Sequence, residues 1–570
     1  MRILTSCLCF FATSCFGATY YIDFQTGSDA YTGTTETIVS PGNTIVGPWK
    51  HHPYMTGSTI SGYKHTAGDR FIFKGGVVWD HTCWPMTIPA GGSASAWDYY
   101  GVDANWYAGT SWTRPIFDNA YNNLAGNNII TLSVWGLNYY LTLDNIEIEH
   151  YFGSTGCMIG AGGVANILLE NLYLHGWRTS NTTDNAQGGI IFTYSGDPQI
   201  ITNVILQTSE LTNAENQGIQ MSGVAVRQIQ TITGCRIHDV SSAVLFTAVC
   251  THNDIYNVSY PAANMGYDQT YHMNGVYLAA GGLLVGGQLT AYCYDNKIHD
   301  VSAGANCIYP VPYGSPSNGY SENQYIFNNI VYGVQSAQLP IEVDPNTGTG
   351  ANVFVFNNTI ICYNNNAPGV HVVNRGSKYM LNNFVCQNNL LIGIGITPSD
   401  ATSSDCTYIS MSNNLTLTPA VASADGYLAA NLWAPRAVNA GVVPSINTAV
   451  QGIFSVDYAG ISRQQGTPWE IGAFQYVSSV APTITSSTQV TPTAGSPFTY
   501  TITATNNPTS FSASPLPTGL TIDTSTGVIS GTLTGIGQFS PITIGATNAS
   551  GTGTAVLTMA PIAAQTSIGP

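Results

Sequence analysis

A short polar and apolar pattern recurs along the middle of the chain: an Asn, one variable residue and an aliphatic residue, with a turn soon after. Six copies have Asn in the first position: Asn253-Asp254-Ile255, Asn296-Lys297-Ile298, Asn328-Asn329-Ile330, Asn358-Thr359-Ile360, Asn388-Asn389-Leu390 and Asn413-Asn414-Leu415. Upstream, the same frame with other residues in the Asn position ends at Ile146, Leu172, Leu211 and Ile237. Consecutive aliphatic positions lie 18 to 43 residues apart. This spacing is typical of the coils of a parallel β-solenoid, whose loops vary in length.

Stacking of such coils assigns a role to each position of the pattern. A coil that cannot bury its apolar side alone becomes stable when neighbouring coils lie about 4.8 Å away. The aliphatic positions are then expected to form an internal column, and the Asn positions an internal ladder of amide hydrogen bonds. Five residues before two of the aliphatic positions lie Cys250 and Cys293. Buried free thiols and a disulfide between neighbouring coils are both compatible with this placement.

Both ends of the repeat region have distinctive segments. Near the N-terminus the chain reads Tyr20-Tyr21-Ile22-Asp23, Gly27-Ser28-Asp29, Pro48-Trp49-Lys50 and Gly68-Asp69-Arg70. This order resembles the N-terminal capping region of secreted right-handed parallel β-helix proteins of the pectate-lyase-like superfamily. Asp457-Tyr458-Ala459-Gly460 and Glu470-Ile471-Gly472-Ala473-Phe474 resemble the segment that closes many such helices. The resemblance implies that residues 19–477 form one right-handed parallel β-helix.

The composition changes after Glu470, because Asp523 is the only formally charged side chain from residue 471 to the end. Residues 498–503 alternate apolar and polar side chains with the period of a strand. The stretch 516–532 resembles the immunoglobulin-like modules attached to many bacterial surface and secreted proteins. We therefore expect an all-β chain, with a linker at 478–481, a small immunoglobulin-like β-sandwich at 482–562 and a tail at 563–570.

The first 18 residues combine one positive charge, an apolar stretch and small residues before Thr19. This composition is typical of a secretory signal peptide and is too short for a membrane span, so we expect a secreted or cell-surface protein. Cleavage near Ala18 and lipid attachment at Cys15 are alternatives. Of the 12 cysteines, nine follow the leader and none forms a Cys-x-x-Cys pair. At least one thiol should therefore be free, and the cysteines indicate neither a zinc site nor a dense disulfide framework.

Charge excludes one class of partner. The 570-residue chain has 14 Lys and Arg against 30 Asp and Glu, a formal charge of −16, and 60 Gly. Phosphate binding needs clustered Arg and Lys, which are not visible here, so we expect no nucleic-acid partner. Each coil of a solenoid contacts only its neighbours, so one long domain is feasible at this length. We expect a monomer.

The residues that flank the internal aliphatic position should point outward, and stacked coils would turn them into a surface groove. Titratable and aromatic residues gather on the four coils from Leu211 to Ile298. The residues before the aliphatic position are Glu210, Arg236, Asp254 and Lys297, and those after it include His238, Tyr256 and His299, with Tyr173 further upstream. This groove is the principal candidate site.

The groove contains the groups needed for β-elimination on a uronic-acid polymer. Arg236 and Lys297 would neutralise the sugar carboxylate, and His238, His299 or Tyr256 would remove the proton from C5. Glu210 and Asp254, about 9.6 Å apart across two coils, would instead suit an inverting glycoside hydrolase. A third interpretation is a self-neutralising surface ladder of alternating charge on a noncatalytic adhesin or glycan-binding scaffold.

The longest interval between coils adds a second group of candidates. Asp268, Tyr271 and Asn274 could contact substrate there, and His272 could reach the groove as a base. Glu342 and Asp344 offer oxygen ligands for calcium, although the spacing of a full calcium loop is missing. No other cofactor is indicated. The sequence thus predicts a secreted carbohydrate-active protein, in the first place polysaccharide lyase-like, whose partner is an extracellular polysaccharide.

Overall fold

The computed structural model of the chain forms two compact units, made by the described residues 17–474 and 481–561. Within these spans the structure describes residues 17–40, 45–124, 127–132, 138–153, 156–162, 164–179, 191–194, 204–207, 210–212, 219–222, 230–240, 243–245, 247–258, 273–279, 283–285, 288–301, 305–312, 322–334, 339–345, 351–362, 369–373, 381–394, 406–424, 455–463, 469–474, 481–506, 508–533, 539–548 and 550–561.

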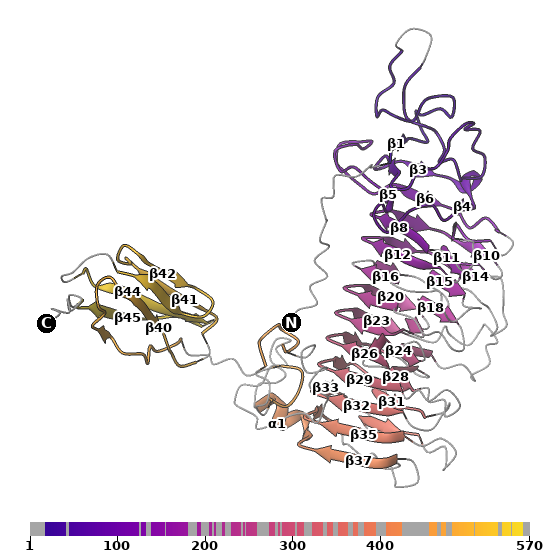
Figure 1. Cartoon of the computed structure of the whole chain (residues 1–570). Helices are drawn as coiled ribbons and strands as arrows, with labels where there is room; N and C mark the ends of the chain where they lie inside the picture. The colour runs from indigo at the N-terminus through magenta and orange to yellow at the C-terminus, as the bar shows by residue number, and fades with distance from the viewer. Residues whose placement is uncertain are drawn as a thin grey trace. The chain divides into compact units, whose positions relative to one another are not determined.

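The first unit consists of stacked coils that build three long parallel sheets (Figure 1). The first sheet contains β1 (Thr19–Ile22), β2 (Arg70–Phe73), β5 (Asp98–Gly101), β8 (Asn138–Asp144), β12 (Ala165–Glu170), β16 (Val204–Gln207), β19 (Gln230–Thr233), β22 (Val249–Thr251), β26 (Gln288–Tyr294), β29 (Glu322–Phe327), β32 (Asn352–Phe356), β35 (Leu381–Gln387) and β37 (Cys406–Ser412), with β25 (Leu283–Val285) antiparallel to β26.

The second sheet, which bears the candidate site, follows in the same coils. It contains β3 (Val78–Trp79), β6 (Ile116–Asp118), β9 (Glu147–Glu149), β13 (Tyr173–His175), β17 (Glu210–Thr212), β20 (Arg236–Val240), β23 (Asp254–Val258), β27 (Lys297–His299), β30 (Ile330–Tyr332), β33 (Thr359–Ile361), β36 (Leu390–Ile392) and β38 (Leu415–Leu417). We call it the site sheet.

The third sheet completes the coils. It contains β4 (Met86–Ile88), β7 (Ile130–Leu132), β11 (Ile159–Gly162), β15 (Ile191–Tyr194), β18 (Ile219–Ser222), β21 (Val244–Leu245), β24 (Met273–Ala279), β28 (Ala305–Val311), β31 (Ile341–Val343) and β34 (Val370–Val372). β10 (Phe152–Gly153) pairs with β14 (Arg178–Thr179) outside these sheets, and the short helices are η1 (His81–Cys83) and α1 (Pro419–Ala424). The predicted parallel β-helix is confirmed.

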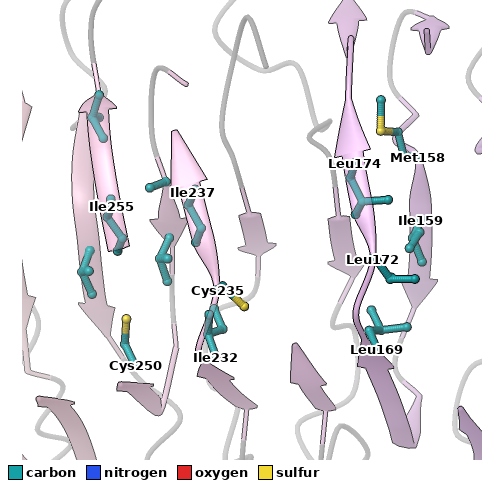
Figure 2. Packing of buried hydrophobic residues seen from close by; sticks show 14 of the residues in the cluster. Met158, Ile159, Leu169, Leu172, Leu174, Ile232, Cys235, Ile237, Cys250 and Ile255 are labelled. Carbon is teal, nitrogen blue, oxygen red and sulfur yellow. The ribbon is translucent and has the colours of Figure 1, made fainter. Parts of the chain in front are cut away.

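The core of this unit lies between the three sheets. Its side chains stack from coil to coil: Ile237 and Ile255 lie on the paired strands β20 and β23, and Leu174 lies in the same register two strands before Ile237 (Figure 2). Each of these three is fully buried. Burying one such side chain stabilises the fold by about 1.5–3 kcal/mol, so the stacked columns account for much of the cohesion between coils.

The predicted Asn ladder is present inside the helix. Its six members are Asn253, Asn296, Asn329, Asn358, Asn389 and Asn414. The Nδ2 of each of the first five donates to the Oδ1 of the next Asn at 2.9–3.0 Å. Each Oδ1 that accepts in this way also accepts the backbone N–H of the preceding Asn, for example Asn329 N to Asn358 Oδ1 at 3.0 Å. The ladder therefore satisfies backbone groups at the turn as well as the amides themselves.

The predicted register is wrong on some coils. Asn328, Asn388 and Asn413 had been assigned to the ladder, but the ladder uses the Asn that follows each of them. The three displaced residues have φ values of 53°, 57° and 54°, the left-handed conformation that Asn tolerates well. On two upstream coils the error is two residues. The sequence predicted Ile146 and Leu172 as the inward aliphatic residues, whereas Ile148 and Leu174 are in register with Leu211.

The cysteines whose side chains are described are all buried free thiols, Cys250 and Cys293 included. Cys250 and Cys293 face each other across neighbouring strands β22 and β26, which is the predicted stacking. Of the two interpretations, the structure has the buried thiols. Burial raises the pKa of the Cys250 thiol well above its ordinary value, which makes it a poor nucleophile.

Residues 455–463 and 469–474 pack against the last coils of the β-helix. Ala473 N donates to Thr359 Oγ1 at 2.9 Å, and Asn357 Nδ2 donates to Gly472 O at 3.2 Å. Arg463 Nη2 donates to the same Gly472 carbonyl at 3.1 Å. This cover buries Thr359 and Leu390, so the outer face of the site sheet is closed at β33 and β36.

The second unit is a small β-sandwich whose strands pair antiparallel, apart from one parallel pair at a sheet edge. One sheet has the order β39 (Gln489–Val490), β45 (Gly551–Met559), β44 (Ile542–Asn548) and β41 (Ser510–Ser514), and the other β40 (Pro497–Thr501), β43 (Val528–Thr532) and β42 (Leu520–Asp523). Ile529, Ile544 and Leu557 are fully buried between the sheets. In the described parts of both units, no helix has the length and apolarity required to span a membrane.

Candidate functional site

Two columns of side chains run along the outer face of the site sheet from β6 to β30. The pairing of strands fixes both columns. The first column contains Glu147, Tyr173, Glu210, Arg236, Asp254 and Lys297. The second contains Asp118, Glu149, His175, Thr212, His238, Tyr256, His299 and Tyr332.

The predicted columns are correct for the four coils from Leu211 to Ile298. The order Glu210, Arg236, Asp254, Lys297 is the order of the paired strands. The side chains of Glu210 and Thr212 lie outside the described part of the structure, and the strand register alone places these two residues. Upstream the shift of two residues moves Tyr173 into the first column and brings Glu149 and His175 into the second, where the sequence analysis had not placed them.

Four aromatic rings stack in the second column, and we call them the ring column: His238, Tyr256, His299 and Tyr332. Their centroids are 4.5, 5.0 and 4.5 Å apart in that order, with interplanar angles of 9°, 9° and 7°. Because the ring faces lie against one another, the column offers ring edges with N–H and O–H groups, rather than faces, to a molecule above the sheet.

Carboxylates hold the two histidines of the ring column. His299 Nε2 lies 3.1 Å from Asp254 Oδ1, and its Nδ1 lies 2.7 Å from Asp300 Oδ2. His238 Nδ1 lies 2.7 Å from Asp239 Oδ2. Both ring nitrogens of His299 are engaged, so this histidine is better placed to position its neighbours than to accept a proton from a substrate.

The charged side chains of the first column interact as the ladder hypothesis predicts. Lys297 Nζ lies 3.7 Å from Asp254 Oδ1 and 5.7 Å from the centroid of the Tyr332 ring. Burial raises the pKa of Asp254, but the hydrogen bond with His299 and the charges of Lys297 and Arg236 outweigh it, and the pKa lies below its ordinary value. Partly exposed pairs of this kind contribute only about 0–1 kcal/mol, so stability alone is a weak reason for the column.

A second group on the same face was not predicted from the sequence. We call it the histidine–carboxylate cluster: Asp118, Glu147, Glu149, His150 and His175. His175 Nε2 lies 2.9 Å from Glu147 Oε1 and 3.3 Å from Glu149 Oε2. His150 Nδ1 lies 2.9 Å from Asp118 Oδ1 and 3.8 Å from Glu149 Oε1. All five side chains are partly buried.

Strand alternation was the signal that could have revealed this cluster. Glu147-Ile148-Glu149 and Tyr173-Leu174-His175 each place a buried aliphatic residue between two outward polar ones. Once Ile148 and Leu174 are taken as the inward residues, Glu149 and His175 become neighbours on paired strands. Burial raises the pKa of Glu149. The nearby histidines His150 and His175 oppose this rise in pKa, and the charge of Asp118 adds to it.

The remaining predicted site residues are Asp268, Tyr271, His272 and Asn274. Asp268, Tyr271 and His272 lie outside the described residues. Asn274 is fully buried on β24 in the third sheet, where its carbonyl accepts from Ala243 N at 2.9 Å.

The predicted calcium ligands have protein partners. Glu342 Oε2 accepts a hydrogen bond from Asn306 Nδ2, and Asp344 Oδ2 accepts one from Tyr309 OH at 2.5 Å. Among the described residues, the two groups of three donors close enough to share an ion both belong to the histidine–carboxylate cluster. Calcium binding at Glu342 and Asp344 stays a prediction.

Comparison with known proteins identifies the second unit. The family described as "Putative Ig domain" matches residues 481–560, which confirms the predicted immunoglobulin-like module. No curated protein matches the chain.

Two solved structures resemble parts of the chain. One is the A-module of a mannuronan C-5 epimerase from Azotobacter vinelandii, with 14% identity and a TM-score of 0.32 over 58% of this chain and 86% of that one. The other is a "putative alpha-galactosidase" from Bacteroides fragilis, with 34% identity and a TM-score of 0.14 over 14% of this chain and 17% of that one. Both TM-scores are below 0.5, so neither likeness supports an activity here.

Proposed function

We propose that this chain is a secreted carbohydrate-active protein that binds an extracellular polysaccharide along the outer face of the site sheet and cleaves it by β-elimination. The observation that supports this proposal most is the pairing of the two columns. Cationic side chains and proton-transfer groups recur side by side on neighbouring strands, about 4.8 Å apart, along one straight face. An extended acidic polymer could contact several of these groups at once.

β-Elimination requires three roles on this face. Arg236 and Lys297 would neutralise the uronate carboxylate, which makes the C5 proton more acidic. His238 or Tyr256 would remove that proton, and the electron pair would form the C4–C5 double bond while the C4–O4 bond breaks. Tyr332, which lies against Lys297, would donate a proton to the leaving oxygen. His299 would hold Asp254 and the neighbouring rings in place.

Noncatalytic glycan binding is the second candidate function. The stacking of the ring column and the Asp254–Lys297 pair favour it, because both give the face a rigid arrangement that needs no reaction to explain it. An adhesin or scaffold would use the same face for binding only. Inverting hydrolysis by Glu210 and Asp254 is compatible with the strand register, because the two residues lie in one column with Arg236 between them.

The test is incubation of the purified protein with a panel of acidic and neutral polysaccharides. Absorbance near 235 nm reports the unsaturated product of elimination, and new reducing ends without that absorbance report hydrolysis. We expect absorbance on at least one uronic-acid polymer, reduced at least 100-fold in His238→Ala/Lys297→Ala. A matched control is His371→Ala/Lys64→Ala, which removes the same two side-chain types away from this face.

Three outcomes separate the hypotheses. Unsaturated products that disappear only in the His238→Ala/Lys297→Ala protein support elimination. Binding without any product, weakened by the same substitution, assigns a noncatalytic role. No product on the whole panel, together with equal glycan binding by the wild type and His238→Ala/Lys297→Ala, would exclude this face as the glycan site.

A further inference from the structure

The histidine–carboxylate cluster brings five oxygen and nitrogen ligands together on three neighbouring strands. The cluster contains two groups of three donor atoms, and within each group all three atoms lie within 4.8 Å of one another. One group comes from Glu147, Glu149 and His175. The other comes from Asp118, Glu149 and His150. Glu149 belongs to both groups. Its Oε2 faces His175 and its Oε1 faces His150, at 3.3 and 3.8 Å.

We propose that Glu147, Glu149 and His175 bind a divalent transition-metal ion, with Zn²⁺ as the best fit. Imidazole and carboxylate are both zinc ligands, and three protein ligands with one open position are the usual set of a non-structural zinc site. The assignment does not depend on the proposed action on polysaccharides, because the site is defined by its own donor atoms.

The distances between the donor atoms suit such an ion. Bonds of about 2.0–2.1 Å in a tetrahedral arrangement place neighbouring ligand atoms about 3.3 Å apart. The separations from His175 Nε2 to Glu147 Oε1 and Glu149 Oε2 are 2.9 and 3.3 Å. An ion can therefore occupy the space in front of the three atoms with small side-chain rotations, and the backbone of β9 and β13 need not move.

The charge of the cluster also favours a cation. Three carboxylates lie against two imidazoles, and each imidazole can add at most one positive charge. The Glu149 carboxylate lies 3.8 Å from His150 Nδ1 and 3.3 Å from His175 Nε2, and it shares its two donor groups with Asp118 and Glu147. A divalent ion would remove the repulsion between the partly buried carboxylates, which histidine alone does only in part.

The second half of the cluster has a supporting role in this arrangement. Asp118 Oδ1 holds His150 at 2.9 Å, and the His150 ring lies 6.1 Å from the His175 ring, centroid to centroid. Tyr173 stacks on His175 at 4.3 Å and fixes the ring that carries Nε2. Such neighbours orient metal ligands, and their loss usually weakens metal binding 10- to 100-fold.

The proposed site has no cysteine ligand, which is consistent with the absence of Cys-x-x-Cys pairs from the sequence. The cysteines indicated no thiolate zinc centre, and the proposed site contains none: its ligands are imidazole and carboxylate. It also differs from the predicted calcium ligands: Glu342 lies on β31 of the third sheet, and Asp344 directly follows that strand. Calcium prefers six to eight oxygen ligands, whereas a histidine nitrogen in a three-donor group selects for zinc.

The test is isothermal titration of the chelator-treated full chain with ZnCl₂, without any polysaccharide. We expect saturable binding to the wild type and at least a 10-fold loss of affinity in His175→Ala and in Glu147→Gln. His238→Ala is the matched control, because it removes another histidine that pairs with a carboxylate on the same face. Its zinc affinity should equal that of the wild type. Co²⁺ in place of Zn²⁺ should give visible absorption bands that His175→Ala lacks.

Circular dichroism of each apo variant separates loss of the site from loss of the fold. Absence of saturable zinc binding to the wild type overturns the proposal. Equal affinity in the wild type, His175→Ala and Glu147→Gln, with all three folded, overturns it as well, because the zinc then binds elsewhere. Since no glycan is present, either result leaves the proposed polysaccharide activity to be judged by its own assay.

Discussion

A single Asn of the ladder holds several buried groups. Asn358 Nδ2 donates to Asn389 Oδ1 and to Ile326 O, both at 2.9 Å, and its Oδ1 accepts from Asn329 N and Nδ2 at 3.0 Å. Removal of this amide leaves a buried carbonyl and a buried N–H without partners. Each such loss costs about 1–3 kcal/mol, so the residue matters far more than its small size suggests.

We predict that Asn358→Ala lowers the free energy of unfolding by about 2–4 kcal/mol. The thermal midpoint, followed by circular dichroism, measures the effect. Asn382→Ala, at an exposed position of β35, should shift the midpoint by less than 1 °C. Equal midpoints for Asn358→Ala and Asn382→Ala would show that the ladder adds little to stability.

Asp295 provides a test of how pH acts on a buried carboxyl. Burial raises its pKa to about 7, and the hydrogen bond with Asn328 and the charge of Arg463 oppose the rise only in part. The folded protein therefore binds a proton at Asp295 that the unfolded chain, with an ordinary carboxyl pKa near 4, releases. The stabilisation from this group is complete at low pH and is lost as pH rises from about 4 to 7.

We predict that Asp295→Asn removes this dependence. The difference between the thermal midpoints of Asp295→Asn and the wild type should move in favour of the variant as pH goes from 5 to 8. The comparison with the wild type at each pH cancels other titrating groups, such as His52, whose pKa burial lowers. Asp103→Asn, which removes a carboxylate that accepts hydrogen bonds from Asn105, serves as the control. A difference that stays constant over the pH range would contradict the raised pKa.

At the scale of the element, the turn into the site sheet is defined by one backbone conformation. The residue before each ladder position has a positive φ in the described coils, for example 57° at His252, 54° at Asp295 and 54° at Asn413. Glycine and Asn adopt this conformation at low cost, and β-branched residues do not. The turn therefore restricts sequence at this position even where the side chain is exposed.

Asn413 allows this restriction to be tested at an exposed side chain. We predict that Asn413→Val destabilises the β-helix by about 1–2 kcal/mol, whereas Asn413→Gly changes its stability by less than 0.5 kcal/mol. Urea denaturation of the two variants measures the difference. Similar midpoints for Val and Gly would mean that the positive φ does not limit this turn.

The same turn explains how far the sequence could be interpreted. The coils with a single Asn, at Asn253 and Asn296, were placed in the correct register because only one residue could supply the ladder amide. Where two Asn are adjacent, as at Asn328-Asn329, either residue could adopt the left-handed turn conformation and either could supply the ladder amide. The pattern of one sequence does not distinguish them, although the difference reverses which side chains point outward.

The histidine–carboxylate cluster was missed for a related reason. On those coils Ile146 and Leu172 lie two residues before the inward Ile148 and Leu174, which is the place of the ladder Asn in later coils. An apolar residue there looks like the inward aliphatic position itself. His238, Tyr256 and His299 could be predicted because their coils keep the Asn-x-aliphatic pattern or the spacing next to it. Tyr332 was missed because the register error at Asn328-Asn329 put Val331 in its place. The cluster was missed because its coils have lost the Asn.

At the scale of the whole molecule, the two units have separate hydrophobic cores. The core of the second unit contains buried residues of its own, among them Ile529, Ile544 and Leu557. β44 and β45 form one antiparallel hairpin of this sandwich. A unit of about 80 residues with a continuous core is within the size range of domains that fold alone.

We predict that a fragment of residues 481–561 folds in isolation with one cooperative thermal transition. Leu557→Ala should destabilise the fragment by about 2–4 kcal/mol, because it opens a cavity in a fully buried site. Val556→Ala, on the same strand but 54% exposed, should change its stability by less than about 0.5 kcal/mol. A fragment without a cooperative transition, or equal effects of the two substitutions, would show that the sandwich depends on the preceding chain for its stability. If the fragment does fold, full-length protein with Leu557→Ala should bind Zn²⁺ with wild-type affinity, since the proposed ligands belong to the other unit.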